Sequence, residues 1–216
     1  LKDNVTTTAI AGLNITADTG IALDGLNIVT TGSGVVTFND AVDISTAAVD
    51  IDAAGTITFA GALTSTGDQN LTLESDGNID FDAAVGSGVD NELGAILIDT
   101  AVNVTADSTI ECASFVQTAG TGTTTFTGEV TTSGATGIDL NGTAFTFSDA
   151  VVTTGGGPVT ITNSGLLTIG ADADMTLSGQ FTQDGAGAVS LAGNITATGT
   201  APVEATGGTI TYSGGY

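Results

Sequence analysis

The sequence predicts an all-β protein built as a single parallel β-helix, a solenoid in which short strands stack coil upon coil. Three observations favour this fold. An apolar–polar–apolar triplet recurs about every 22 residues, two further apolar registers keep the same period, and turn-forming residues separate the registers. In such repeat proteins each unit packs only against its neighbours. We therefore expect one continuous domain over residues 1–216, with about ten coils of three short strands each.

The first register is clearest in Ile57-Thr58-Phe59, where alternation predicts Ile and Phe inside the coil and Thr outside. The equivalent triplets are expected at 13–15, 36–38, 79–81, 102–104 (Val102-Asn103-Val104), 124–126, 145–147, 167–169, 189–191 and 210–212. Stacking of these triplets predicts an internal aromatic column formed by Phe38, Phe59 and Phe81 and resumed by Phe126 and Phe147.

Two further registers repeat with the same period. The second strands of the coils are expected at Val42, Leu63, Val85, Ile110, Val130, Val151 and Ile195. The third strands are expected at Val49, Leu71, Ile138, Val159, Phe181 and Val203. The segment 86–95 (GSGVDNELGA) is longer than the matching stretch of the other repeats, so we expect a protruding corner loop that leaves the stack unbroken.

Charge narrows the range of partners. The chain has 24 acidic residues, one Lys, no Arg and no His, for a net charge of -23. This field repels phosphate backbones and anionic lipid surfaces, so neither nucleic acid nor such a membrane surface is an expected partner. No apolar run approaches the roughly 18 residues that span a bilayer, so membrane insertion is not expected. Cations and basic proteins are the favoured partners.

The single cysteine, Cys112, excludes an intramolecular disulfide. It lies in Ile110-Glu111-Cys112-Ala113-Ser114, and we expect it to be buried, as free cysteines usually are. The stack must then be stabilised without covalent cross-links.

Residues 57–85 (ITFAGALTSTGDQNLTLESDGNIDFDAAV) combine an Ile-Thr-Phe-x-Gly-Ala-Leu stretch with Asn-Leu-Thr-Leu-x-x-x-Gly. This pattern resembles the β-strand repeats of bacterial filamentous-haemagglutinin-like and autotransporter-type surface proteins, and the resemblance extends over essentially the whole chain. It implies a right-handed parallel β-helix, secretion, and a place in the stalk of an extracellular adhesin or filament. The motif specifies a fold and no particular ligand.

An enzyme is not expected, and no catalytic or cofactor-binding residue is predicted. A lyase acting on uronates needs positive groups to bind its substrate, and the chain has only Lys2. A glycosidase needs two carboxyl groups across a sugar-binding cleft. Pairs such as Asp50 and Asp52 place both carboxyl groups on one outward strand face, and the chain has no Trp to hold a sugar.

A cation site is the more reasonable chemical hypothesis, because Ca²⁺ prefers several carboxylate and carbonyl oxygens. The 86–95 loop offers Asp90 and Glu92, and Asp68 holds the same corner position one coil earlier. These three residues are the candidate calcium ligands. No dedicated calcium motif supports them, and solvated surface carboxylates are the alternative.

The function expected from the sequence is structural. No capping helix precedes Ala9, so we expect coils to continue beyond this chain or copies to stack end to end. The main prediction is a shaft or filament subunit of a secreted bacterial surface protein or extracellular fibre. The alternative is an adhesin-type module that binds a cation, a glycan or a protein.

Overall fold

The computed structural model describes residues 1–8, 12–88, 90–198, 203–205 and 210–212. The described residues form 26 short β-strands and no helix, in agreement with the all-β prediction. Among them no helix is long and apolar enough to cross a bilayer. Every strand pairing is parallel, because each strand pairs with its equivalents in the preceding and following coils.

The strands form three faces, and the following lists give each face in chain order. The first face contains β2 (Leu13–Ile15), β5 (Val36–Phe38), β8 (Ile57–Phe59), β11 (Ile79–Phe81), β13 (Val104–Ala106), β15 (Thr123–Phe126), β17 (Ala144–Phe147), β20 (Leu167–Ile169), β23 (Val189–Leu191) and β26 (Ile210–Tyr212). The second contains β3 (Ile21–Leu23), β6 (Val42–Ile44), β9 (Leu63–Ser65), β18 (Val151–Thr153), β21 (Met175–Leu177) and β24 (Ile195–Ala197). The third contains β1 (Val5–Thr7), β4 (Asn27–Thr30), β7 (Val49–Ala53), β10 (Leu71–Ser75), β12 (Leu93–Thr100), β19 (Val159–Asn163), β22 (Phe181–Gln183) and β25 (Val203–Ala205).

Two long strands join the second and third faces in the middle of the molecule. β14 (Ile110–Gln117) and β16 (Val130–Gly142) each run through the corner between these faces without leaving the sheet. One coil earlier the second face is reduced to a single residue, Val85, which bridges Leu63 and Ile110. The two faces are therefore one continuous sheet at this point and separate sheets near the amino-terminal end.

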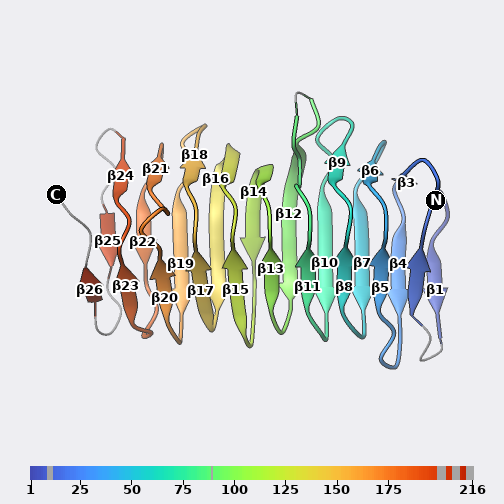
Figure 1. Cartoon of the computed structure of the whole chain (residues 1–216), viewed down its shortest axis with the longest axis horizontal. Coiled ribbons are helices and arrows are strands. Elements are labelled where there is room, and N and C mark those ends of the chain that lie inside the picture. The colour runs from blue at the N-terminus through green and yellow to red at the C-terminus, as the bar shows by residue number, and fades with distance from the viewer. Residues whose placement is uncertain (9–11, 89, 199–202, 206–209, 213–216) are drawn as a thin grey trace.

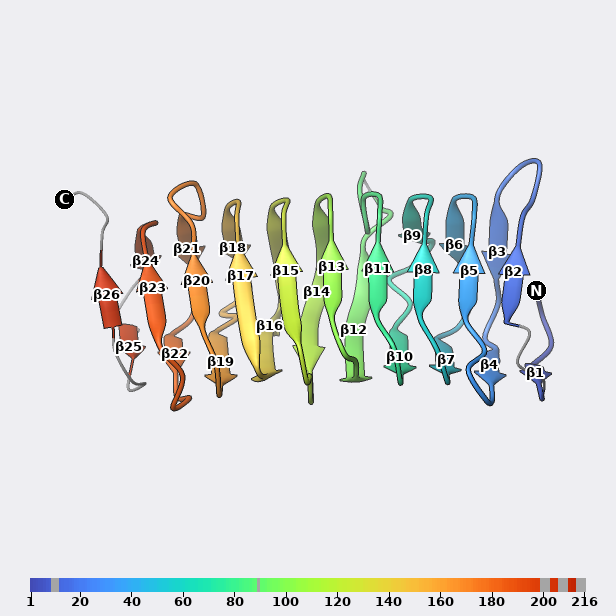
Figure 2. The same cartoon turned by 60° about the horizontal axis from the view of Figure 1, so that its bottom comes forward.

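The ten strands of the first face are separated by nine intervals, so the chain makes about nine turns with a mean repeat of about 22 residues. The strands stand side by side along one axis (Figure 1), and the first-face strands form an unbroken row when the molecule is turned (Figure 2). At about 4.8 Å per coil, this stack is about 43 Å long. The predicted parallel β-helix is confirmed.

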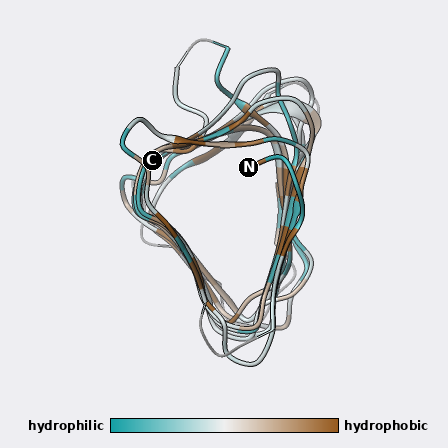
Figure 3. Cartoon of the chain, turned by 90° about the vertical axis from the view of Figure 1, so that its right-hand side faces the viewer, coloured by the Kyte–Doolittle hydropathy of each residue, from teal (hydrophilic) through white to brown (hydrophobic). Residues whose placement is uncertain are grey.

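Seen along its axis, the molecule is roughly triangular, and only corner loops project from the common outline (Figure 3). The apolar residues of all three faces point into the triangle and form one core that follows the whole axis. Their polar neighbours on each strand point outward, so most strands show alternating burial, as in β8 with buried Ile57 and Phe59 around the half-buried Thr58. This alternation is the geometry that a strand imposes on successive side chains.

The predicted aromatic column is confirmed. Phe38 and Phe59 stack with ring centroids 5.0 Å apart, Phe59 and Phe81 at 5.4 Å, and Phe126 and Phe147 at 5.0 Å. All five rings are buried. The column exists because in-register parallel strands place identical positions of successive coils directly over one another.

The triplet predicted at 102–104 is wrong by two residues. The strand is β13, in which Val104 pairs with Ile79 and Ala106 pairs with Phe81. Val102 lies in the corner before the strand and is 40% exposed. The outward residue of this coil is therefore Thr105, and Asn103 instead joins the corner, where its amide donates to Asn78 Oδ1 at 3.1 Å.

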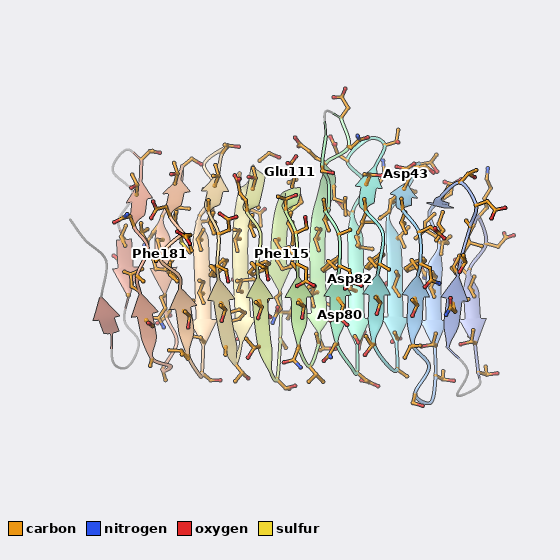
Figure 4. All side chains as sticks on the ribbon, in the orientation of Figure 1. Asp43, Asp80, Asp82, Glu111, Phe115 and Phe181 are labelled. Carbon is orange, nitrogen blue, oxygen red and sulfur yellow. The ribbon has the colours of Figure 1, made fainter. Side chains whose placement is uncertain are left out.

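Ala106 interrupts the aromatic column, and a larger side chain elsewhere in the same coil offsets it. Phe115 lies on the third face, at a position that its neighbours fill with Ile96 and Ile138. Phe115 lies near the middle of the stack (Figure 4). Its ring meets the ring of Phe126 edge-on, with centroids 5.2 Å apart. The core thus keeps its volume by exchanging a large and a small residue between two faces of one coil.

The protruding corner loop was predicted at 86–95. In the structure the loop ends earlier, at the residue before Leu93, where the next strand begins. Leu93 is fully buried and begins β12, so residues 93–95 belong to the strand. The chain takes 25 residues from Phe81 to Ala106 and then only 20 from Ala106 to Phe126. The extra length is absorbed at a corner, and the stack continues in register as expected.

Candidate functional site

The candidate calcium ligands lie on two corner loops that join the second face to the third. Asp68 follows β9, and Asp90 lies in the next loop along the axis. Both are exposed and have a left-handed backbone, with φ of 55° and 62°. Hydrogen bonds tie the loops together, since Ser65 N–H donates to Asn91 O at 3.1 Å and Gly94 N–H to Gln69 O at 3.0 Å. The loops are therefore neighbours, as predicted.

Glu92 lies at the base of the same loop, two residues from Asp90 and beside the buried Leu93. Val89 lies outside the described residues. Among the described residues, both in this loop and elsewhere, no three carboxylate, His or Cys side chains lie closely enough together to hold a metal ion. The loops bring candidate residues into neighbouring positions without assembling a ligand set, and calcium binding stays a prediction.

A group of interacting carboxylates lies on the third face. This third-face acidic cluster consists of Asp50 and Asp52 on β7, Glu74 on β10, Asp76 and Asp99. Asp52 pairs directly with Glu74 across the two strands. The carboxylate of Asp52, followed by partial burial and then the other carboxylates, raises the pKa of Glu74 above its usual value. Partial burial and the charges of Asp52 and Asp99 likewise raise the pKa of Asp50.

A smaller acidic group lies on the first face and the corner after it. Asp80 points outward from the middle of β11, and Asp82 follows the strand (Figure 4). Burial, and after it the charge of Asp82, raises the pKa of Asp80, while a hydrogen bond involving Thr105 acts in the opposite direction. In both groups, like charges within one coil or on adjacent coils repel one another with no cation nearby, since Lys2 pairs with Asp24 at 3.7 Å.

Cys112 is buried as predicted, with 2% of its surface exposed. It lies on β14 between Leu93 and Thr132 of the neighbouring coils. Burial, and after it the negative charge of Glu92, raises the pKa of the thiol to about 12. A buried thiol with a raised pKa is a poor nucleophile near neutral pH, because nucleophilic attack needs the thiolate.

Three buried amide side chains depart from the apolar core. Gln117, Asn163 and Gln183 are at most 2% exposed and lie at the carboxyl ends of the third-face strands β14, β19 and β22. Gln183 Nε2 donates to Asn163 Oδ1 at 2.7 Å and to Gly185 O at 3.0 Å. Asn163 Nδ2 in turn donates to Gly165 O at 2.7 Å. Gln117 Oε1 accepts a hydrogen bond from the buried Thr124 hydroxyl at 2.7 Å.

A groove lined by small residues lies at the corner next to these amides. It has a volume of about 380 Å³ and is lined by 118–120, 141–143, 162–164 and 184–186, one segment from each of four successive coils. Only Thr143 separates β16 from β17, whereas 118–122 separate β14 from β15 and 184–188 separate β22 from β23. The short connection recesses the middle of the corner between two longer ones. We call this feature the corner groove.

Neither the corner groove nor the buried amides were predicted from the sequence. A signal for the amides exists, because Gln117 and Gln183 occupy inward positions that Leu140 and Ile161 fill in the coils between them. An amide at such a position breaks the apolar register. The groove itself depends on differences of a few residues in corner length, which the repeat pattern does not reveal.

The fold and these sites define the molecule as an acidic parallel β-solenoid. Comparison with protein-family models, with curated proteins and with solved structures gave no match.

Proposed function

We propose that the chain is a non-catalytic structural segment, a shaft or filament subunit, of a secreted bacterial surface protein or extracellular fibre. The observation that carries the proposal is the continuity of the core, which follows the axis from the first coil to the last in the described residues. A stack of this kind sets a fixed distance between its ends. The resemblance of 57–85 to filamentous-haemagglutinin-like repeats supports the same reading.

The edges of the stack support self-association as the partner interaction. In the described part of the chain, β1 and β2 each pair with a strand on one side only. The outer edge of β3 is covered by Leu1, whose ammonium group donates to Ala22 O and whose carbonyl accepts from Asp24 N–H at 3.1 Å. Leu13 and Ile15 of β2, which point toward the core, are only partly buried. An unpaired parallel edge with incomplete apolar burial is a template for a further coil. A second copy, or a further coil of the same chain, would satisfy these groups.

Electron microscopy of negatively stained protein over a range of concentrations tests the proposal. We expect rods of constant width whose lengths grow in steps of about 48 Å, because each added copy contributes ten coils at about 4.8 Å per coil. Uniform single particles at every concentration, with no growth in length, would contradict self-association. The size distribution in solution, measured by light scattering, should shift in parallel with the images.

A variant of the edge strand makes the test specific. Leu13 N–H donates to Val35 O, and Ile15 O accepts from Asn39 N–H, so the backbone of the intervening Asn14 faces away from β5. Asn14→Pro removes the outward N–H and should block the addition of a coil while sparing the internal pairing. Asn14→Ala, which keeps this N–H, is the matched control and should assemble as the unmodified protein does. Equal assembly of both variants would exclude this edge as the contact.

A further inference from the structure

The corner groove has the chemistry of a binding site, and its ligand class follows from its lining. Its walls carry Asn141, Thr162 and Ser164, which are exposed and whose side chains form no hydrogen bond with the described residues. Amides and hydroxyls both donate and accept hydrogen bonds. Three unused groups of this kind, in adjoining coils, can bind a ligand whose own groups alternate between donor and acceptor.

Charge excludes anionic ligands from this groove. Asp184 is the only charged residue in its lining, and no Lys, Arg or His is present there. The whole chain carries a net charge of -23. An anionic sugar, a phosphate or a nucleotide would meet repulsion both locally and from the field of the molecule. The ligand is therefore neutral or cationic.

The lining also narrows the chemistry of the ligand. It contains Thr, Ser, Asn, Asp, Gly and Ala, so it exposes methyl and methylene carbons beside amide, hydroxyl and backbone polar groups. A sugar presents both hydroxyl groups and C–H surface and therefore matches a mixed lining of this kind. Because the lining has no aromatic side chain, hydrogen bonds rather than ring stacking would hold the sugar.

The groove has the size for a short chain of sugar rings. Its four coils span three intervals, which is about 14 Å. Its volume of about 380 Å³ falls in the range of roughly 300–1,000 Å³ typical of small-molecule sites. An extended ligand lying along the axis would meet one corner segment per coil.

The buried amides fix the floor of the groove before any ligand arrives. The bonds from Gln183 to Asn163 and Gly185, and from Asn163 to Gly165, tie two of the four corners to the core. At the other end, Gly120 lies directly over Gln117, and a Cβ there would come within 2.4 Å of Gln117 Nε2. A floor held in this way loses little conformational freedom on binding, which favours affinity.

We propose that the corner groove is a binding subsite for a short neutral oligosaccharide, held by Asn141, Thr162 and Ser164 over the floor of buried amides. The proposal is independent of the shaft function, because it concerns one corner of four coils and needs no self-association. A solenoid segment that carries such a subsite would place a glycan contact at a fixed height along its axis.

The experiment is a titration of the isotope-labelled chain with maltotriose, cellotriose and triacetylchitotriose, followed by NMR through the backbone amides. We expect at least one trisaccharide to cause saturable shifts in the amides of 118–120, 141–143, 162–164 and 184–186. Ser164→Phe places a ring across the groove and should weaken this binding by at least about tenfold. Ser33→Phe alters an exposed serine at the same kind of corner near the amino-terminal end and should leave the affinity unchanged.

Asn141→Ala removes one wall group without adding bulk and keeps the test valid if the Phe variant does not fold. It should also weaken binding, with an unchanged spectrum outside the groove. The proposal is overturned if none of the three sugars shifts the groove amides, or if the shifts are the same in Ser164→Phe. A tetralysine peptide that shifts these amides when the sugars do not would reassign the groove to a cationic peptide.

Discussion

Phe59 shows what a single residue contributes to this architecture. Its ring stacks on Phe38 on one side and on Phe81 on the other, so its removal opens a cavity between two coils. Phe59→Ala should lower the free energy of unfolding by about 3–5 kcal/mol. Urea denaturation followed by circular dichroism measures this change.

The matched control for Phe59 is its neighbour Thr58, which points outward from the same strand. Thr58→Ala should change the free energy of unfolding by no more than about 0.5 kcal/mol. If the two substitutions cost the same, the inward and outward positions of β8 have been assigned incorrectly.

Cys112 allows a chemical test of burial at the residue scale. Its side chain is 2% exposed, and burial raises the pKa of its thiol to about 12. At about pH 8, a free thiol of pKa about 8.5 reacts readily with a disulfide reagent. In the folded protein we expect Cys112 to react far more slowly than in the same protein unfolded in urea. Equal rates in the two states would show that the middle coils open readily.

At the scale of elements, the third-face acidic cluster makes stability depend on pH. A carboxyl group whose pKa is raised in the folded protein binds its proton more tightly there than in the unfolded chain. Asp50 and Glu74 of this cluster have raised pKa values, and so does Asp80 of the smaller acidic group on the first face. Their ionisation therefore destabilises the fold at neutral pH, and their protonation removes this penalty. We expect the melting temperature to rise as the pH falls from neutral toward about pH 4.

Glu74→Gln tests the same cluster without a change of pH. It removes the charge that faces Asp52 on the neighbouring strand and should raise the melting temperature near neutral pH. Asp18→Asn removes an exposed charge from a loop near the amino-terminal end and is the control. If Glu74→Gln raises the melting temperature no more than Asp18→Asn does, the effect comes from the net charge of the molecule and not from repulsion within the cluster.

The strand positions could be predicted from the sequence wherever the inward residues are large and apolar. β8 and β11 are such cases, because Ile57, Phe59, Ile79 and Phe81 mark both inward positions without ambiguity. β13 could not be placed correctly, because its second inward residue is the small Ala106, and the exposed Val102 mimics an inward position. Pattern alone cannot tell an exposed valine at a corner from a buried one in a strand.

The candidate site was less predictable than the strands. Neighbouring corner positions for Asp68 and Asp90 follow from the repeat, and the loops that carry them are indeed hydrogen-bonded. Whether side-chain oxygens converge depends on loop conformation, which the repeat does not determine. The corner groove was missed for a related reason, because it arises from differences in connection length between coils.

At the scale of the whole molecule, the chain carries 24 acidic residues and only one Lys, with no Arg. Self-repulsion destabilises a compact chain of this charge, and dissolved salt screens it over a distance that shrinks to about 10 Å at 0.1 M. We expect the melting temperature to rise steadily with NaCl concentration.

CaCl₂ at matched ionic strength tests the calcium prediction, since an additional rise in the melting temperature that Asp90→Asn abolishes would place the ion at this loop. No additional rise would exclude the site.

The uneven coil lengths around β13 have a consequence for how this chain tolerates change. The coil from Phe81 to Ala106 is long and the next is short, yet the inward residues on both sides stay in register. Each coil contacts only its neighbours, so residues added at an exposed corner do not alter the spacing along the axis. The segment between Gly86 and Leu93 is therefore a natural insertion point. A foreign peptide placed there would be displayed at a defined height on an unaltered rod.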